Sequence, residues 1–145
     1  MNTTNHIEVK RARVRTLAWS LMTNRPKDFN LGRCGECSIG HCSSMPEFQI
    51  AGVEKKGNQS YWGGEPLLWR PAEFFGLASQ YFGMPHSVDD ASAVMGRTEL
   101  YVMRYAYADP FLVGITYLAA IGDCGPPEKA RAARLMPVVI ERVEA

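Results

Sequence analysis

The densest group of chemically capable side chains lies between residues 34 and 42. Cys34, Cys37, His41 and Cys42 occur in this short stretch, and the remaining cysteine, Cys124, stands in a distant Gly/Pro-rich loop. Thiolates and imidazoles bind metal ions, and thiolates also act as nucleophiles and redox groups. The cluster therefore raises three chemical hypotheses: a metal site, a redox site and a nucleophilic enzyme.

A structural zinc site needs four tetrahedral ligands, often supplied as two closely spaced pairs. Cys34 and Cys37 form one acceptable pair. His41 and Cys42 are adjacent, and neighbouring residues seldom both reach one ion, so the fourth ligand would have to be Cys124. A single C-x2-C pair is a weak zinc signal without a matching pair. Zinc is therefore one interpretation of the cluster, and the spacing does not require it.

The other chemical interpretations rest on patterns that are also incomplete. A thioredoxin-like redox site places C-x-x-C beside a βαβ unit, which this sequence does not indicate. A cysteine nucleophile needs a base, and Cys37 or Cys42 with His86, oriented by Asp89 or Asp90, would form a triad. Free cysteine is also among the most buried residue types. We expect the cluster to organise structure around a tight glycine turn, with buried cysteines and no catalytic role.

Short motifs surround the cluster over residues 30–95. They are Cys34-Gly35, Cys37-Ser-Ile-Gly40-His41, Pro46-Glu-Phe48, Gly52 and Ala72-Glu-Phe-Phe-Gly-Leu77. This order resembles small uncharacterised proteins of phages and proteobacteria, which have a C-G-T-x-x-C-x-x-G-W core, a P-E-F segment and an A-x-x-F/L-F/L-G-L helix. Here one residue is missing between the cysteines, and His41 stands where the family usually has tryptophan. The resemblance implies a small helical domain that mobile elements often carry, and it points to no particular activity. Because His41 replaces a packing tryptophan, the resemblance favours a core or pocket position for His41 over a role as a metal ligand.

Two further sets of residues are candidates for binding. The basic residues Lys10, Arg11, Arg13 and Arg15 follow one another on the first predicted helix and could contact nucleic acid, although most charged helix faces are only solvated. The aromatic residues Tyr61, Trp62 and Trp69 surround glycines and could stack on a base or line a small-molecule pocket. We favour a solvated face for the first set and a loop folded onto the core for the second.

The first half of the chain is predicted to contain one long helix followed by an irregular segment. A helix over residues 6–22 carries an apolar stripe, and further apolar residues on a second face indicate that it is covered on more than one side. The stripe consists of Ile7, Val14, Leu17, Ala18 and Leu21, and the second face of Val9, Ala12 and Trp19. Residues 26–66 are rich in Gly, Pro and Cys and lack periodicity, which predicts an irregular region. Within it we expect a short helix ending at residue 50, an exposed turn over 55–60 and an aromatic loop over 61–66.

The second half of the chain has clearer helix signals. Pro71 suits the start of a helix that reaches Phe82 and that Gly76 could divide in two. Asp109 as N-cap, Pro110 in the first turn and Gly122 at the end frame an apolar helix that we expect to be central. Helices are also expected over residues 87–95 and from residue 126 onward, where Pro137 should bend the chain. Residues 99–107 are assigned to helix, with strand as the alternative.

Composition excludes few function classes. The 145 residues carry a net charge of +1, with a basic excess in the first 36 residues and an acidic excess thereafter. This balance permits an acidic partner without demanding one. The chain shows no apolar signal-peptide region and no run long enough to span a membrane, so we expect a cytoplasmic protein that does not bind membranes.

The sequence therefore predicts a mainly α protein, residues 1–145 forming a single globular domain of five to six helices with an irregular Cys/Gly-rich segment. The function that we favour is non-catalytic: a binding or regulatory protein, carried by a phage or another mobile element, that acts through contact with a protein partner. One alternative is a nucleic-acid-binding protein that uses the basic first helix. The other is a thiol- or zinc-dependent enzyme centred on residues 34–42.

Overall fold

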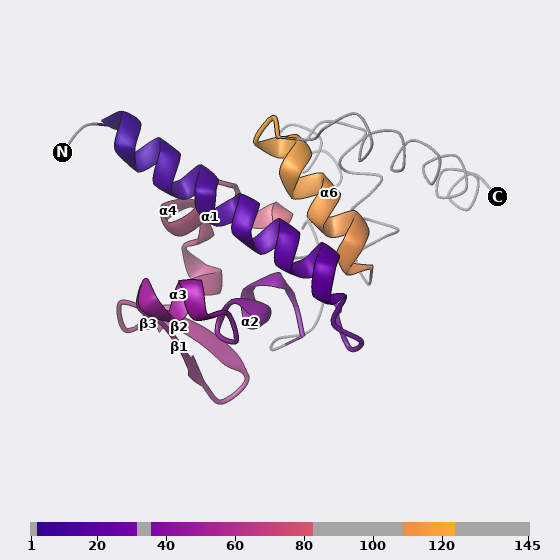
Figure 1. Ribbon diagram of the computed structural model, residues 1–145. Helices are drawn as coiled ribbons and strands as arrows, with labels where there is room; N and C mark the ends of the chain where they lie inside the picture. The colour runs from indigo at the N-terminus through magenta and orange to yellow at the C-terminus, as the bar shows by residue number, and fades with distance from the viewer. Residues whose placement is uncertain (1–2, 32–35, 83–108, 124–145) are drawn as a thin grey trace.

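The computed structural model describes residues 3–31, 36–82 and 109–123 of the chain (Figure 1). Cys34, His86, Asp89, Asp90 and Cys124 lie outside these residues. The elements expected over 87–95, over 99–107 and beyond residue 126 lie outside them as well. Five α-helices and a small three-stranded sheet occupy the described part, so its helical character is as expected.

Two long helices, α1 and α6, form the main packing contact of the described residues. α1 runs over Thr3–Asn24 and α6 over Pro110–Ala120. The two helices lie against each other along the second half of α1 (Figure 1). Val14, Leu17 and Leu21 of the predicted stripe are buried in the core. The two halves of α1 therefore differ in their packing, because only the second half contacts α6.

α6 has the boundaries and the burial that its sequence predicts. The Asp109 carboxylate accepts hydrogen bonds from the backbone N–H groups of Phe111 and Leu112, and Pro110 occupies the first turn. Gly122 follows the helix with φ of +75°, a conformation that glycine adopts without strain. Five of its large side chains, Leu112, Val113, Ile115, Tyr117 and Leu118, are buried, and so is Ile121 just after its end, which confirms that the helix is central.

The second apolar face of α1 is not covered, so that prediction was wrong. Val9, Ala12 and Trp19 are exposed, and Ile7 of the stripe is exposed too. The first half of α1 extends past α6 and is contacted there by the short helix α4 (Figure 1). α4 covers one side of the first half of α1, and the opposite side, with Val9 and Ala12, is left at the surface.

From residue 38 onward the 26–66 segment is built mainly of short helices and strands, which corrects the expectation of an irregular region and an aromatic loop there, whereas residues 26–31 contain no helix or strand. It contains α2 (Ser38–Cys42), α3 (Pro46–Ile50), β1 (Val53–Lys56), β2 (Gln59–Trp62) and β3 (Glu65–Pro66). The strands form an antiparallel sheet in the order β1-β2-β3, with Val53 opposite Trp62 and Trp62 opposite Glu65. Tight turns at residues 57–58 and 63–64 join the strands. Gly63 and Gly64 both have positive φ, which explains why two glycines follow an aromatic pair.

The remaining elements complete an aromatic core. η1 (Leu67–Trp69) leads into α4 (Pro71–Phe75), and η2 (Ser79–Tyr81) follows. Gly76 has φ of +75° and ends α4, so the predicted division of this helix occurs at the predicted glycine. The rings of Phe48, Phe74, Phe75, Phe82 and Tyr117 contact one another in edge-to-face and stacked pairs. Among the described residues no helix is both long enough and apolar enough to cross a membrane.

Candidate functional site

The two described cysteines of the cluster are buried and form hydrogen bonds with backbone groups of α2. Cys37 is the N-cap of α2, and its Sγ accepts a hydrogen bond from the Gly40 N–H at 3.4 Å. Cys42 is fully buried and donates its thiol proton to the Ser38 carbonyl at 3.2 Å. Burial raises the pKa of the Cys42 thiol well above its ordinary value. Both cysteines are buried, and a buried neutral thiol is a poor nucleophile.

A zinc site is not assembled within the part of the chain that the structure describes. There, no group of three His, Cys, Asp or Glu side chains is placed to hold a metal ion. Cys34 and Cys124 are outside the described residues, so the four-ligand set that includes them stays a prediction. The His41 ring extends to α1, where its Nε2 lies at hydrogen-bond distance from Ser20 Oγ.

His41 is joined to α1 by a short chain of hydrogen bonds. Its Nε2 lies 2.9 Å from Ser20 Oγ, and Asn24 Nδ2 donates to the same oxygen at 3.1 Å. Burial lowers the pKa of His41 below its ordinary value, so the ring is neutral near pH 7. A neutral imidazole carries one N–H and one acceptor nitrogen. Ser20 and His41 therefore have complementary donor and acceptor groups at hydrogen-bond distance.

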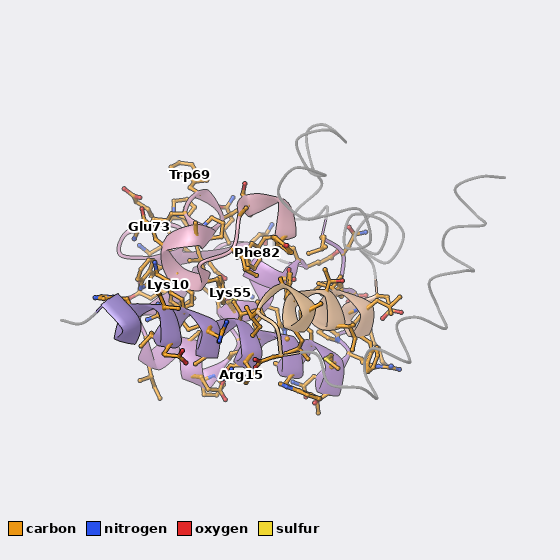
Figure 2. All side chains as sticks on the ribbon, turned by 90° about the horizontal axis from the view of Figure 1, so that it is seen from above. Lys10, Arg15, Lys55, Trp69, Glu73 and Phe82 are labelled. Carbon is orange, nitrogen blue, oxygen red and sulfur yellow. The ribbon has the colours of Figure 1, made fainter. Side chains whose placement is uncertain are left out.

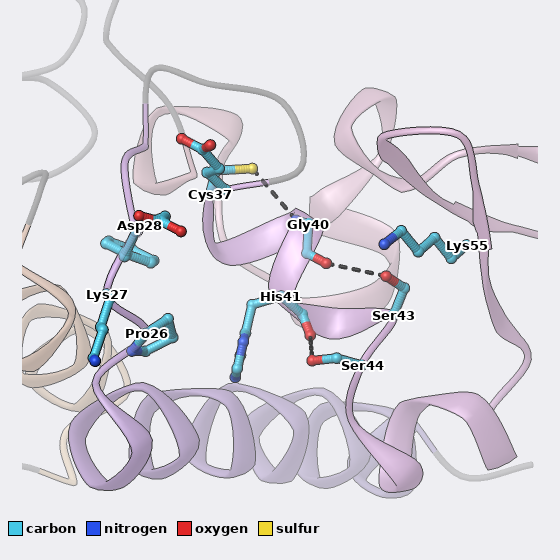
Figure 3. A pocket seen from close by; sticks show the side chains of 11 residues that line it. Pro26, Lys27, Asp28, Cys37, Gly40, His41, Ser43, Ser44 and Lys55 are labelled. Carbon is cyan, nitrogen blue, oxygen red and sulfur yellow. Dashed lines mark hydrogen bonds between the residues drawn. The ribbon is translucent and has the colours of Figure 1, made fainter.

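Two cavities meet at His41. The first measures about 350 Å³ and lies between the chain after α1, α2 and Lys55 of β1. Figure 3 shows the His41 ring extending from α2 towards α1, with Asp28 and Lys55 on opposite walls. The second measures about 360 Å³ and lies between α1 and the start of α3. Its walls are Thr16, Trp19, Ser20, Thr23, Asn24, Met45, Pro46 and Glu47, and His41 and Ser44 line both cavities.

The four basic residues of α1 do not share one surface. The Arg13 guanidinium lies 4.1 Å from the Phe74 ring centroid and donates to the Phe74 carbonyl at 3.2 Å. Arg15 forms an ion pair with Asp123. Lys10 packs its side chain beside Gly76, and Arg11 is exposed. Figure 2 shows Lys10 and Arg15 well apart along the helix. Two of the four charges are thus used within the fold.

The aromatic candidates are separated in the same way. Trp62 lies between two guanidinium groups, with Arg70 at 4.5 Å and Arg13 at 5.9 Å from its ring. Tyr61 lies 5.1 Å from the Lys56 ammonium group. Trp69 is 77% exposed and projects from η1 (Figure 2). Trp62 is therefore part of the packed structure, as we expected for this region, whereas Trp69 is presented to solvent.

Sequence reasoning did not select Ser20 and Asn24. Their i, i+4 spacing on a predicted helix indicates that the two side chains are neighbours, but serine and asparagine are common on helix surfaces. Only the position of His41 on α2 gives the pair a chemical partner. No family model matches this chain, and comparison with curated proteins and with solved structures found no similar protein either.

Proposed function

We propose that this protein is a non-catalytic binding or regulatory protein, folded as one predominantly helical domain, that acts in the cytoplasm by contact with a protein partner. Its resemblance to small phage and proteobacterial proteins suggests that a mobile element carries it. The burial of the described thiols supports a binding role, and so does the use of two of the four basic residues of α1, Arg13 and Arg15, in contacts within the fold.

The observation that carries this proposal is the exposure of two large apolar side chains on the segments that flank the sheet. Ile50 at the end of α3 is 89% exposed, and Trp69 in η1 is 77% exposed. Ile50 precedes β1, and Trp69 follows β3. Tryptophan is enriched at the energetic centres of protein interfaces. We take these two exposed side chains as the partner-binding surface.

The test compares three single variants in photo-crosslinking from a bacterial cell extract. Trp69→Ser and Ile50→Ser remove the apolar groups of the surface, and Val9→Ser is the matched control, because Val9 is an exposed apolar residue on α1. Partners that crosslink to the unchanged protein and to Val9→Ser, but not to the two surface variants, support the proposal. Equal crosslinking by all three variants, or equal loss in all three, refutes this surface.

The nucleic-acid alternative has its own direct test. Binding through Lys10, Arg11, Arg13 and Arg15 would weaken steeply with salt, because each neutralised phosphate releases counterions. Two of these residues already contact Phe74 and Asp123, so no observation on this fold favours the alternative. Failure of the unchanged protein to bind DNA or RNA at low ionic strength would end it.

A further inference from the structure

We propose that Ser20 and His41 form a nucleophile–base pair that accepts acyl groups from small esters bound in the cavity between α1 and α3. This activity is additional to the binding function proposed above, uses neither Ile50 nor Trp69, and, if confirmed, would show that the protein also has a catalytic site. It rests on three observations: the Ser20–His41 distance, the neighbouring Asn24 amide and the cavity into which the pair opens.

The pair meets the geometric requirement for nucleophilic catalysis. A serine hydroxyl is activated when a base accepts its proton, which requires a separation of about 2.6–3.2 Å. Ser20 Oγ and His41 Nε2 lie 2.9 Å apart, and they come from different helices, α1 and α2. The ring is neutral because burial lowers the pKa of His41, and in the tautomer that carries its proton on Nδ1 the Nε2 lone pair accepts the serine proton. Both residues line the same cavity, so a bound ester can reach the hydroxyl.

Asn24 supplies a donor beside the reacting oxygen. A primary amide carries two N–H groups, and one of them donates to Ser20 Oγ at 3.1 Å. The other N–H can donate to an oxygen bound next to Ser20. In acyl transfer, negative charge develops on the carbonyl oxygen, and a fixed donor at that position lowers the barrier. Asn24 lines the cavity together with Ser20, which places the donor on the substrate side of the pair.

The cavity walls define the class of ester. A volume of about 360 Å³ is near the lower end for ligand sites, about 300–1,000 Å³, so it suits a short acyl group on a small alcohol. Trp19, Met45 and Pro46 provide apolar wall for a methyl or aryl group. Glu47 on the same wall carries a negative charge and repels anionic substrates. Neutral or cationic esters of short-chain acids are therefore the expected substrates.

The reaction proceeds in two balanced steps. The Ser20 Oγ–H bond breaks as its proton passes to His41 Nε2, and Oγ forms a bond to the ester carbonyl carbon, whose π electrons move to the carbonyl oxygen. The carbonyl then re-forms and the bond to the alcohol oxygen breaks. The alcohol leaves with the proton held by His41, and an acyl-serine remains. Water repeats the sequence through His41, which releases the carboxylic acid and restores the serine hydroxyl.

The experiment uses p-nitrophenyl acetate with the full-length protein, followed by release of nitrophenolate and by mass spectrometry. Trypsin does not cut between Arg25 and Pro26, so Ser20 falls in the fragment 16–27, where it is the sole serine. The variants are Ser20→Ala, His41→Gln and the matched control Ser79→Ala. Ser79 is a good control because it is an exposed serine of η2 that lines neither of the two cavities at His41.

The expected result is an acetyl group on Ser20 in the unchanged protein and in Ser79→Ala, and none in Ser20→Ala. His41→Gln should slow acetylation by about 10²–10⁴-fold, because general-base catalysis contributes that much. Circular dichroism of each variant separates loss of reaction from loss of fold. Mapping the adduct in the unchanged protein needs no variant. An unmodified Ser20 in that protein, or equal rates in His41→Gln and the unchanged protein, would overturn the proposal.

Discussion

Replacing Gly114 with alanine should destabilise this protein, although glycine to alanine in a helix interior is normally stabilising. Gly114 lies in α6 at a point where this helix passes close to Ala18 and Met22 of α1. A Cβ atom at this position would stand 2.5 Å from Met22 Cγ and 2.8 Å from the Ala18 carbonyl oxygen. An ordinary contact is at least 3.4 Å, so the α1 backbone would have to retreat by roughly 0.6 Å, the difference 3.4 − 2.8.

The net effect follows from two opposing terms. Alanine gains about 1 kcal/mol of helix propensity over glycine. Overpacking a close contact costs about 1–3 kcal/mol, and here one of the two obstacles is backbone that has no alternative rotamer. We therefore expect a loss of about 1–2 kcal/mol in the free energy of unfolding, measured by urea denaturation with circular dichroism. At this chain length that loss lowers Tm by about 2–8 °C.

The matched control is Ala12→Gly, at an exposed position inside α1. It changes helix propensity alone and should cost about 0.5–1 kcal/mol. If Gly114→Ala instead proved more stable than the unchanged protein by a similar amount, the propensity term would have acted without a steric penalty. The close approach of α1 and α6 at Ala18 and Met22 would then be wrong.

Three further outcomes are expected. Leu118→Ala should lower the free energy of unfolding by about 2–5 kcal/mol, because Leu118 is fully buried in α6, and a loss below about 1 kcal/mol would make this helix peripheral. Thiol titration at neutral pH should label Cys37 and Cys42 far more slowly in the native protein than after denaturation. Protection that disappears when a chelator releases metal would show a structural zinc, and rapid labelling of metal-free protein would show a reactive thiol. Burial lowers the pKa of His41, so the unfolded state binds its proton first on acidification. The free energy of unfolding should therefore be level near neutral pH and fall as the pH drops through the ordinary histidine range. His41→Gln should make that fall shallower, and an unchanged fall would show that the ring is not buried.

Local backbone chemistry made several elements predictable from the residues alone. Asp109, Pro110 and Gly122 frame α6 because capping and the φ angles of proline and glycine depend on neighbours within one turn. Gly76 divides the helix that starts at Pro71 for the same reason. α3 begins at Pro46 and ends at Ile50, as its first-turn proline indicates. The buried state of the described cysteines follows from their apolar character.

Tertiary structure decided the sheet and the partners of the polar side chains. The strands of 53–66 have at most four residues, too short for an alternating pattern to be recognised before they pair. Ser20 meets His41 across 21 positions of sequence, Arg13 meets the Phe74 carbonyl across 61, and Arg15 meets Asp123 across 108. No local pattern encodes such distances, because they depend on how α1 packs against α2, α4 and α6. The sequence alone determined where several helices begin and end. Packing determined that Arg13 and Arg15 form contacts within the fold and that Ser20 lies beside His41.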